Sequence, residues 1–321
     1  MKRIGVLTSG GDAPGMNACI RAVVRAGIAR GVETVGIRRG YIGLLELNAE
    51  TLTSRSVGGI ARWGGTIIET ARCPEFETPE GIRKGVENFR RLGLDAVIVI
   101  GGDGSLRGAL ELHKAGVPCA GVPGSIDNDV CETETSIGVD TAMNTILEAI
   151  DKLKDTASAH RRAFVVEVMG RRSGYLALAA GVAGGAEMVI APERPQSMED
   201  IVLEMERARQ RGKPHFIIVV AEGAVPSASA ICSTLIAEHP GFDARLTVLG
   251  HVQRGGSPTA SDRLLATKLG AGAVEALLRG ERGVMVGVRE GQAVSVPLDK
   301  VLCTDRPADG ELLRLEDMIA L

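Results

Sequence analysis

The chain has 321 residues, a formal net charge of −3, 45% hydrophobic residues and 24% charged residues. This length favours two domains, and the near-neutral charge gives no electrostatic reason to expect a nucleic-acid or membrane partner. Its six cysteines form no CxxC pair, and the opening MKRIGVLTSGG lacks the apolar stretch of a signal peptide. We therefore expect a cytoplasmic protein with reduced thiols.

Short apolar runs alternate with amphipathic segments along the whole chain, which is typical of an α/β fold. The candidate strands are Arg3–Leu7, Thr34–Ile37, Ala96–Ile100, Cys119–Val122, Phe164–Val168, Met188–Ala191, Phe216–Ala221 and Thr247–Leu249. Because these runs are continuously apolar, they predict strands buried on both faces of largely parallel sheets. Helical spacing over Met143–Leu153 predicts one helix, and Ser197 is the expected N-cap of another. In such doubly wound folds ligands gather at the carboxyl ends of strands.

Two glycine-rich turns follow candidate strands in the first third of the chain. TSGGDAPGMN contains Gly10 and Gly11, which fit either a phosphate loop or a tight strand-to-helix turn. GGDGS, residues 101–105, surrounds Asp103 with three glycines whose backbone N–H groups can face a polyphosphate. Asp103 then suits Mg²⁺, which prefers oxygen ligands. A solvated turn is the alternative, but the position directly after an aliphatic strand favours a nucleotide site.

Residues 121–130, GVPGSIDNDV, place Asp127, Asn128 and Asp129 together after an apolar run. Such crowding of charge is unfavourable unless a cation, a base partner or solvent takes it up. The residues suit a solvated turn, since Pro, Gly, Ser, Asn and Asp form turns readily. They equally suit a catalytic carboxylate at the end of a strand.

Later strand ends also carry polar residues. MGRRSGYLALAAG, residues 169–181, places Arg171 and Arg172 where we expect a helix to start, a position that favours anions. Glu222 follows the strand at 216–221, and GHVQRGGSP, residues 250–258, carries His251 and Arg254. Packing does not require charge at five strand ends, whereas a functional site does.

Six motifs occur along the chain in the order SGGDAPGMN, IGGDGS, PGSIDND, EVMGRRSGYLA, AEG and LGHVQRGGSP. Together they resemble the bacterial ATP-dependent type of the 6-phosphofructokinase family, and the resemblance covers essentially the whole chain. The resemblance implies two doubly wound, Rossmann-like domains with the active site in the cleft between them. Residues 1–138 with 252–304 would bind ATP, and residues 139–251 with 305–321 would bind fructose 6-phosphate. The implied reaction is Mg²⁺-dependent transfer of the γ-phosphoryl of ATP to the 1-hydroxyl of fructose 6-phosphate, the committed step of glycolysis.

The resemblance also implies roles for individual residues. Asp127 would be the general base, Asp129 would help organise the metal region, and Ser125, where the family more often has Thr, would contact the transferring phosphoryl together with Arg171. The residues implied at the nucleotide are Gly11, Arg72, Cys73, Gly102, Asp103, Gly104, Ser105 and Gly108, with Asp103 on Mg²⁺. The residues implied at the sugar phosphate are Ser125, Ile126, Asp127, Arg162, Met169, Gly170, Arg171, Glu222, Arg245, His251 and Arg254. In the family the arginines matching Arg162 and Arg245 come from a neighbouring subunit, so a homotetramer with active sites across subunit interfaces is implied.

The same resemblance also implies which phosphoryl donor the protein uses and where an allosteric effector binds. Pyrophosphate-dependent relatives tend to carry Asp and Lys where this chain has Gly104 and Gly124, which favours ATP. An effector site for ADP or phosphoenolpyruvate is implied at Arg21, Arg25, Lys154, Gly185, Glu187, Arg211 and Lys213. Lys154 stands where the family often has Arg, and His215, outside every motif, is interpreted as an ordinary histidine. The rival functions are a pyrophosphate-dependent enzyme, another GGDG kinase such as an NAD kinase, and a catalytically inactive regulatory subunit.

Overall fold

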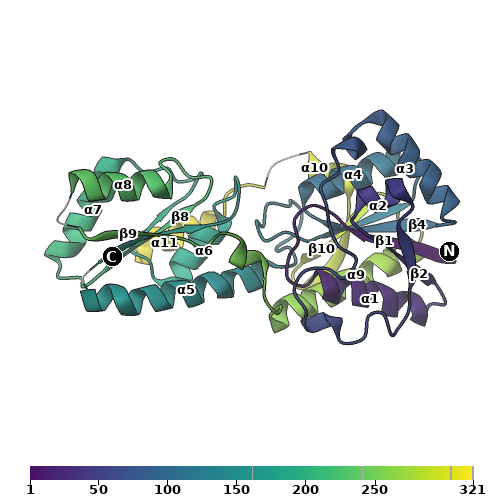
Figure 1. Cartoon of the computed structure of the whole chain (residues 1–321), viewed down its shortest axis with the longest axis horizontal. Coiled ribbons are helices and arrows are strands. Elements are labelled where there is room, and N and C mark those ends of the chain that lie inside the picture. The colour runs from purple at the N-terminus through teal and green to yellow at the C-terminus, as the bar shows by residue number, and fades with distance from the viewer. Residues whose placement is uncertain (161, 240–241, 304–305, 320–321) are drawn as a thin grey trace. The chain divides into compact units, whose positions relative to one another are not determined.

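The computed structural model describes residues 1–160, 162–239, 242–303 and 306–319 (Figure 1). Spatial contacts divide the chain into unit 1, Met1–Thr141 with Arg254–Arg306, and unit 2, Ala142–Gln253 with Pro307–Leu321. Both units are built from parallel strands and helices, so the predicted α/β class is confirmed. The assignment of ATP to one unit and sugar phosphate to the other stays a prediction. No helix within the described ranges is long and apolar enough to cross a membrane.

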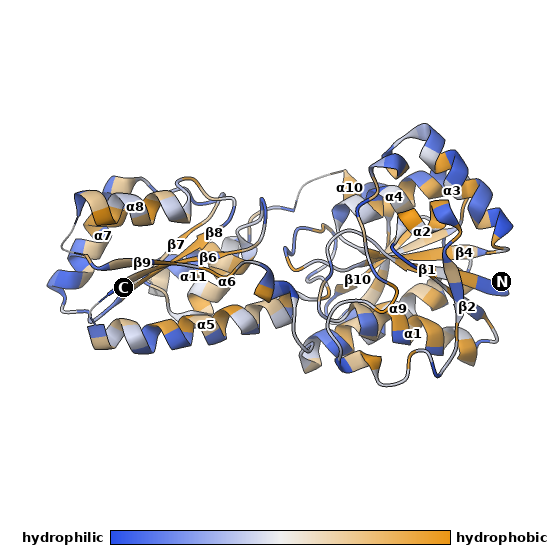
Figure 2. Ribbon diagram, viewed as in Figure 1, coloured by the Kyte–Doolittle hydropathy of each residue, from blue (hydrophilic) through white to orange (hydrophobic). Residues whose placement is uncertain are grey.

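Unit 1 contains a seven-stranded sheet in the order β11-β10-β5-β4-β1-β2-β3. Its strands are β1 (Arg3–Thr8), β2 (Glu33–Ile37), β3 (Ala49–Leu52), β4 (Ala96–Gly101), β5 (Cys119–Pro123), β10 (Val284–Arg289) and β11 (Gln292–Pro297). The five inner strands are parallel, and the edge strands β3 and β11 are antiparallel to their neighbours. The inner strands are coloured as hydrophobic in Figure 2, as expected for strands that are covered on both faces.

Helices cover both faces of this sheet. They are α1 (Met16–Ala29), α2 (Tyr41–Glu46), α3 (Pro79–Arg91), α4 (Asp103–Lys114), α9 (Ala260–Leu278) and α10 (Leu298–Leu302), with short 3₁₀ turns η1 (Ile60–Arg62) and η2 (Pro74–Glu77). In Figure 1, α1 and α9 pack together on one face, while α2, α3 and α4 lie on the other. Every residue of β4 is buried, so this strand lies in the centre of the hydrophobic core.

Unit 2 contains a four-stranded parallel sheet in the order β7-β8-β6-β9. Its elements are α5 (Val139–His160, which begins in unit 1), β6 (Ala163–Val168), α6 (Tyr175–Gly184), β7 (Met188–Ile190), α7 (Met198–Gln210), β8 (Phe216–Ala221), α8 (Ala228–Glu238), β9 (Ala244–Val248), the 3₁₀ turn η3 (Gly250–Arg254) and α11 (Gly310–Ile319). The predicted helix over Met143–Leu153 lies within α5. Ser197 caps α7 as expected, since its side chain accepts a hydrogen bond from the backbone N–H of Asp200.

Candidate active site

The carboxyl ends of β1 and β4 approach each other closely in unit 1. The N–H of Ser9 donates to the carbonyl of Ile100 at 3.1 Å. A Cβ atom on Gly101 would lie only 2.6 Å from the carbonyl oxygen of Ser9, so glycine is required for this approach. The two glycine-rich segments that the sequence places after separate strands are therefore brought together, as expected for one site.

The guanidinium of Arg254 packs against the backbone of Gly11. A Cβ atom at Gly11 would lie 2.2 Å from Nη1 of Arg254, which donates to the carbonyl of Asp12 at 3.1 Å. Arg254 was expected at the sugar phosphate and Gly11 at the nucleotide phosphates. Because the two touch, Arg254 lies beside the β1 loop and can contact an anion bound there.

Helix α4 begins at the glycine-rich turn after β4. Gly102 is its N-cap and Asp103 its first residue, so the unpaired N–H groups of the first turn face the end of the strand. Asp103 accepts a hydrogen bond from Nε of Arg107 at 2.8 Å, and its side chain is 42% exposed. A Cβ atom on Gly104 would meet no atom within 4 Å, so the space beside the helix start is open.

Two of the predicted nucleotide residues also have packing roles. A Cβ atom on Gly108 would lie 2.7 Å from the ring of Tyr41, whose hydroxyl donates to the carbonyl of Ser105 at 2.6 Å. Cys73 is half-buried, and burial raises the pKa of its thiol. The thiol packs against the core below β4, so backbone groups remain for a ligand at this position.

The loop after β5 carries the crowded carboxylates. Its start is tied to β4, because the N–H of Gly124 donates to the carbonyl of Gly101 at 3.0 Å. Asp127 is 2% exposed, and its N–H donates to Oγ of Ser125 at 3.2 Å. The solvated turn is therefore excluded for Asp127, which is buried beside the glycine-rich end of β4. Ile126 is fully buried, so the structure leaves none of its atoms open to the substrate contact expected of it.

The donor set in this part of unit 1 fits Mg²⁺. Asp103 presents an accessible carboxylate at the open end of the nucleotide turn, and the hydroxyl of Ser125 donates to Asp129 at 3.3 Å nearby. Mg²⁺ is commonly held by one or two carboxylates together with substrate phosphates and water. Within the described ranges there is no cluster of three or more His, Cys, Asp or Glu suited to a metal.

The carboxyl ends of β6, β8 and β9 are joined in unit 2 by two side chains. Glu222, after β8, accepts a hydrogen bond from the N–H of Arg171 at 2.6 Å. The fully buried Gln253, in η3, accepts one from the N–H of Met169 at 3.2 Å and donates to the carbonyl of Gly250 at 2.9 Å. The predicted residues Met169, Arg171 and Glu222 are thus brought together. Gln253 lies inside a recognised motif, but sequence reasoning gave it no role.

The segment 169–174 is a turn rather than the start of a helix. Arg171 adopts a left-handed conformation, with φ of 52°, and Gly170 has φ of 145°. Helix α6 begins only at Tyr175, so the prediction that Arg171 and Arg172 lie at a helix start is wrong. Glycine at 170 allows the sharp turn, because a Cβ atom there would lie 2.3 Å from the carbonyl oxygen of Ser173. Both arginine side chains are exposed and accessible to an anion.

Arg162 and Arg245 lie at the opposite end of the same sheet. Arg162 precedes β6, and Arg245 pairs in register with Phe164 near the start of that strand. Both arginines bind Asp243, with a distance of 2.6 Å from Nη2 of Arg245 to Oδ1. Since a strand advances about 3.3 Å per residue, roughly 20 Å separates Arg162 from Met169. Within one chain these arginines cannot join Met169 and Arg171 around a single small molecule.

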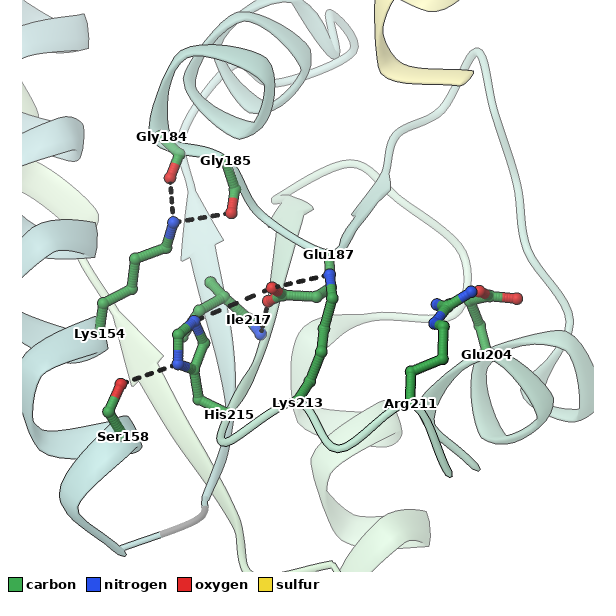
Figure 3. A network of polar contacts seen from close by, with 10 residues as sticks. All are labelled: Lys154, Ser158, Gly184, Gly185, Glu187, Glu204, Arg211, Lys213, His215 and Ile217. Atoms are coloured by element: carbon green, nitrogen blue, oxygen red, sulfur yellow. Dashed lines mark hydrogen bonds and ion pairs between the residues drawn. The ribbon is translucent and has the colours of Figure 1, made fainter. Parts of the chain in front are cut away.

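The predicted effector residues of unit 2 form a polar network, drawn in Figure 3. Lys213 pairs with Oε1 of Glu187 at 3.4 Å, and Oε2 of Glu187 accepts the N–H of Ile217 at 2.8 Å. His215 belongs to this network as well, since its Nε2 lies 3.9 Å from Glu187 and its Nδ1 2.8 Å from Oγ of Ser158. His215 is thus half-buried with both ring nitrogens near polar partners, which agrees with its interpretation as an ordinary surface or satisfied histidine, although no sequence motif marks those partners.

Lys154 lies at the edge of the same network and stabilises a helix end. Its ammonium donates to the carbonyls of Gly184 and Gly185, where α6 ends in a left-handed turn (Figure 3). Arg211 binds Glu204 at 3.2 Å. Arg21 and Arg25 lie on α1 in unit 1, and Arg25 donates to the carbonyl of Ser54 at 3.2 Å.

The remaining predicted residues, Arg72 and His251, are both exposed. Arg72 lies in the segment before η2, and His251 lies in η3. Their side chains are therefore accessible to ligands.

Comparison with known proteins gives matches over most or all of this chain. The family model described as phosphofructokinase matches residues 3–277. The ATP-dependent 6-phosphofructokinase of Shouchella clausii is 50% identical over 321 residues, which is 100% of both chains. Phosphofructokinase of Pichia pastoris, solved in the T-state, has a TM-score of 0.90 and 39% identity over 94% of this chain and 35% of its own. A pyrophosphate-dependent phosphofructokinase from Nitrosospira multiformis shares the fold, with a TM-score of 0.88 and 18% identity over 99% of this chain and 91% of its own.

Proposed function

The chain belongs to the phosphofructokinase family, and from this premise we propose that it transfers the γ-phosphoryl of ATP to the 1-hydroxyl of fructose 6-phosphate. The products are fructose 1,6-bisphosphate and ADP. The observation that carries the proposal is the buried carboxyl of Asp127, in a loop joined directly to the glycine-rich end of β4. The glycine-rich turn that we propose to bind the nucleotide follows β4, and the loop that carries the Asp127 carboxylate follows the adjacent strand β5.

The chemistry requires positioning and charge stabilisation more than covalent work by the protein. Asp127 accepts the proton of the 1-hydroxyl as the oxygen attacks the γ-phosphorus, and the phosphorus–oxygen bond to ADP breaks. Asp103 is the residue that would hold Mg²⁺, which when bound neutralises charge on the phosphates. Arg171 and Arg72 are accessible cations suited to the equatorial oxygens. Arginine is appropriate there, because its planar fork binds phosphate in a bidentate manner.

ATP is favoured as donor by the space beside Gly104. Since nothing lies within 4 Å of a Cβ atom at this position, the α-phosphate can be accommodated. Gly124 was expected to leave open space for the nucleotide, but the structure shows close packing there. A Cβ atom at Gly124 would lie 3.3 Å from side-chain atoms of Ile100 and Met16. Its importance is therefore close packing of the β5 end, and the argument for ATP depends on Gly104.

A shared active site explains where the phosphate-binding arginines lie. Arg162 and Arg245 are at the amino ends of β6 and β9, whereas Met169 and Arg171 are at a carboxyl end. We propose that each site takes these two arginines from a neighbouring subunit of a homotetramer. Coexpressing an Asp127→Asn chain with an Arg162→Ala chain tests this, since hybrids then contain some sites with both native residues. Regained turnover supports sharing, and inactive hybrids of verified composition contradict it.

The polar network around Glu187 and Lys213 suits an effector such as ADP or phosphoenolpyruvate. Lys213, Arg211 and His215 supply positive or protonatable groups within one surface region of unit 2. Titration of each effector against the fructose 6-phosphate saturation curve tests the assignment. The curve should shift for the native chain and less for Lys213→Ala, and a curve that no effector moves would contradict an effector site.

The reaction is tested by supplying the purified chain with fructose 6-phosphate, Mg²⁺ and one donor at a time. Fructose 1,6-bisphosphate, followed by a coupled assay, should form with ATP and not with pyrophosphate. Product formed from pyrophosphate alone would contradict the donor. Phosphorylation of NAD in place of fructose 6-phosphate would contradict the acceptor.

A further inference from the structure

The loop that carries Asp127 has little regular structure of its own. It connects β5, which ends at Pro123, to α5, which begins at Val139. Asn128 within it is fully buried in a left-handed conformation, with φ of 49°. Such a conformation persists only where surrounding contacts enforce it. The backbone carbonyls of an irregular buried loop also need hydrogen-bond donors from elsewhere.

Arg306 supplies these donors from a segment far away in sequence. Its Nη1 donates to Oδ1 of Asn128 at 3.3 Å, to the carbonyl of Val130 at 3.2 Å and to that of Thr133 at 2.8 Å. Its Nη2 donates to the carbonyl of Glu134 at 2.7 Å. One planar guanidinium therefore contacts four residues of the loop, a geometry that lysine cannot reproduce.

We propose that Arg306 is a positioning residue for phosphoryl transfer: its guanidinium holds the loop 127–136 in the shape that presents Asp127 to the acceptor hydroxyl. The inference rests on the proposed function, in which Asp127 is the base. Asn128 links the two residues, because its Oδ1 accepts both Nη1 of Arg306 and the N–H of Ser136 at 3.1 Å. Asn128 shares a peptide plane with Asp127, so a shift of Asn128 is transmitted to the backbone of Asp127.

The other contacts of this loop do not replace Arg306. Thr133 accepts the N–H of Val288 at 3.0 Å, and Glu132 pairs with Arg289 and Lys300 on the surface. These contacts anchor the far side of the loop to β10 and α10. Without Arg306, the carbonyl of Val130 loses this donor and Oδ1 of Asn128 keeps only the N–H of Ser136, so this part of the loop can relax while the far side stays attached. A displacement of about 1 Å at a catalytic group can lower the rate by about 100-fold.

The test compares Arg306→Ala, Arg306→Lys and the matched control Arg289→Ala in kcat, in KM for both substrates and in thermal unfolding. Arg289 contacts the same loop from its exposed side. We expect Arg306→Ala to lower kcat by about 30- to 100-fold, with KM for ATP within about threefold. Arg306→Lys keeps the charge and an ammonium donor but not the planar fork, so it should fold as the native chain does and lose about tenfold. Arg289→Ala should stay within about twofold.

A double-mutant cycle with Asp127→Asn separates positioning of the base from a merely structural role. If Arg306 acts through Asp127, the loss caused by Arg306→Lys should nearly vanish when Asp127 is already Asn. An equal loss in both backgrounds, or native kcat in a folded Arg306→Ala or Arg306→Lys protein, overturns the inference. If Asp127→Asn itself keeps near-native turnover, the base assignment in the proposed function has failed instead.

Discussion

Gln253 connects the ends of two strands in unit 2, and its replacement by Leu should destabilise the protein and weaken sugar binding. Leu has a similar volume but cannot accept the N–H of Met169 at 3.2 Å or donate to the carbonyl of Gly250 at 2.9 Å. An unsatisfied buried donor costs about 1–3 kcal/mol, and a lost hydrogen bond to a half-buried carbonyl about 0.5–1.5 kcal/mol. We therefore expect Gln253→Leu to lower the free energy of unfolding by about 2–4 kcal/mol.

Calorimetry and steady-state kinetics check this expectation together. In a chain of 321 residues a loss of that size should lower Tm by about 3–6 °C, and KM for fructose 6-phosphate should rise because Met169 precedes the turn that we propose to bind the sugar. Val252 is the matched control, since it is the adjacent residue of η3 and is 62% exposed. Val252→Thr should leave Tm within about 2 °C. A Gln253→Leu protein with the Tm of the native chain would refute the reasoning.

Two further predictions concern a close contact and a pH dependence. Gly108→Ala should cost about 1–3 kcal/mol in urea unfolding, because its Cβ atom would lie 2.7 Å from the ring of Tyr41. Gly104→Ala, which meets nothing within 4 Å, should gain up to about 1 kcal/mol; a loss for both contradicts the packing. Burial and then the charge of Glu222 raise the pKa of Glu167, so its ionisation at higher pH destabilises the folded chain. Glu167→Gln should therefore raise Tm at pH 7.5 by about 1–3 °C and leave it unchanged near pH 3.5, and an equal rise at both values contradicts this cause.

The parallel core of the fold could be predicted from sequence because its strands carry their own signal. β4 and β8 are continuous apolar runs, and both were predicted within a residue of their observed bounds. The prediction was poorer at the sheet edges. β9 begins at Ala244 rather than Thr247, since the charged and exposed Arg245 interrupts the apolar run and only Ala244 of the strand is fully buried. β3 is a short, largely exposed edge strand, so its four residues give no periodic signal.

The site could be predicted where one residue type implies one chemistry. Asp127 and Asp103 follow strands within glycine-rich turns, so their placement at strand ends could be inferred before any contact was known. The supporting residues could not be found in this way. Gln253 contacts Met169 across 84 positions of sequence, and Arg306 contacts Asn128 across 178. Both act on backbone groups of the loops they hold, and such contacts depend on the folded chain rather than on a local motif.

The measurement that tests the central claim most directly is kcat of Asp127→Asn with ATP and fructose 6-phosphate, beside the control Glu132→Gln, which changes an ion-paired carboxylate at the far side of the loop. Removal of a general base should lower kcat by about 10²–10⁴-fold, with a much smaller change in KM for either substrate. Glu132→Gln, in the same loop, should remain within about twofold. A folded Asp127→Asn protein that turns over at more than about a third of the native rate would contradict proton abstraction by this carboxylate.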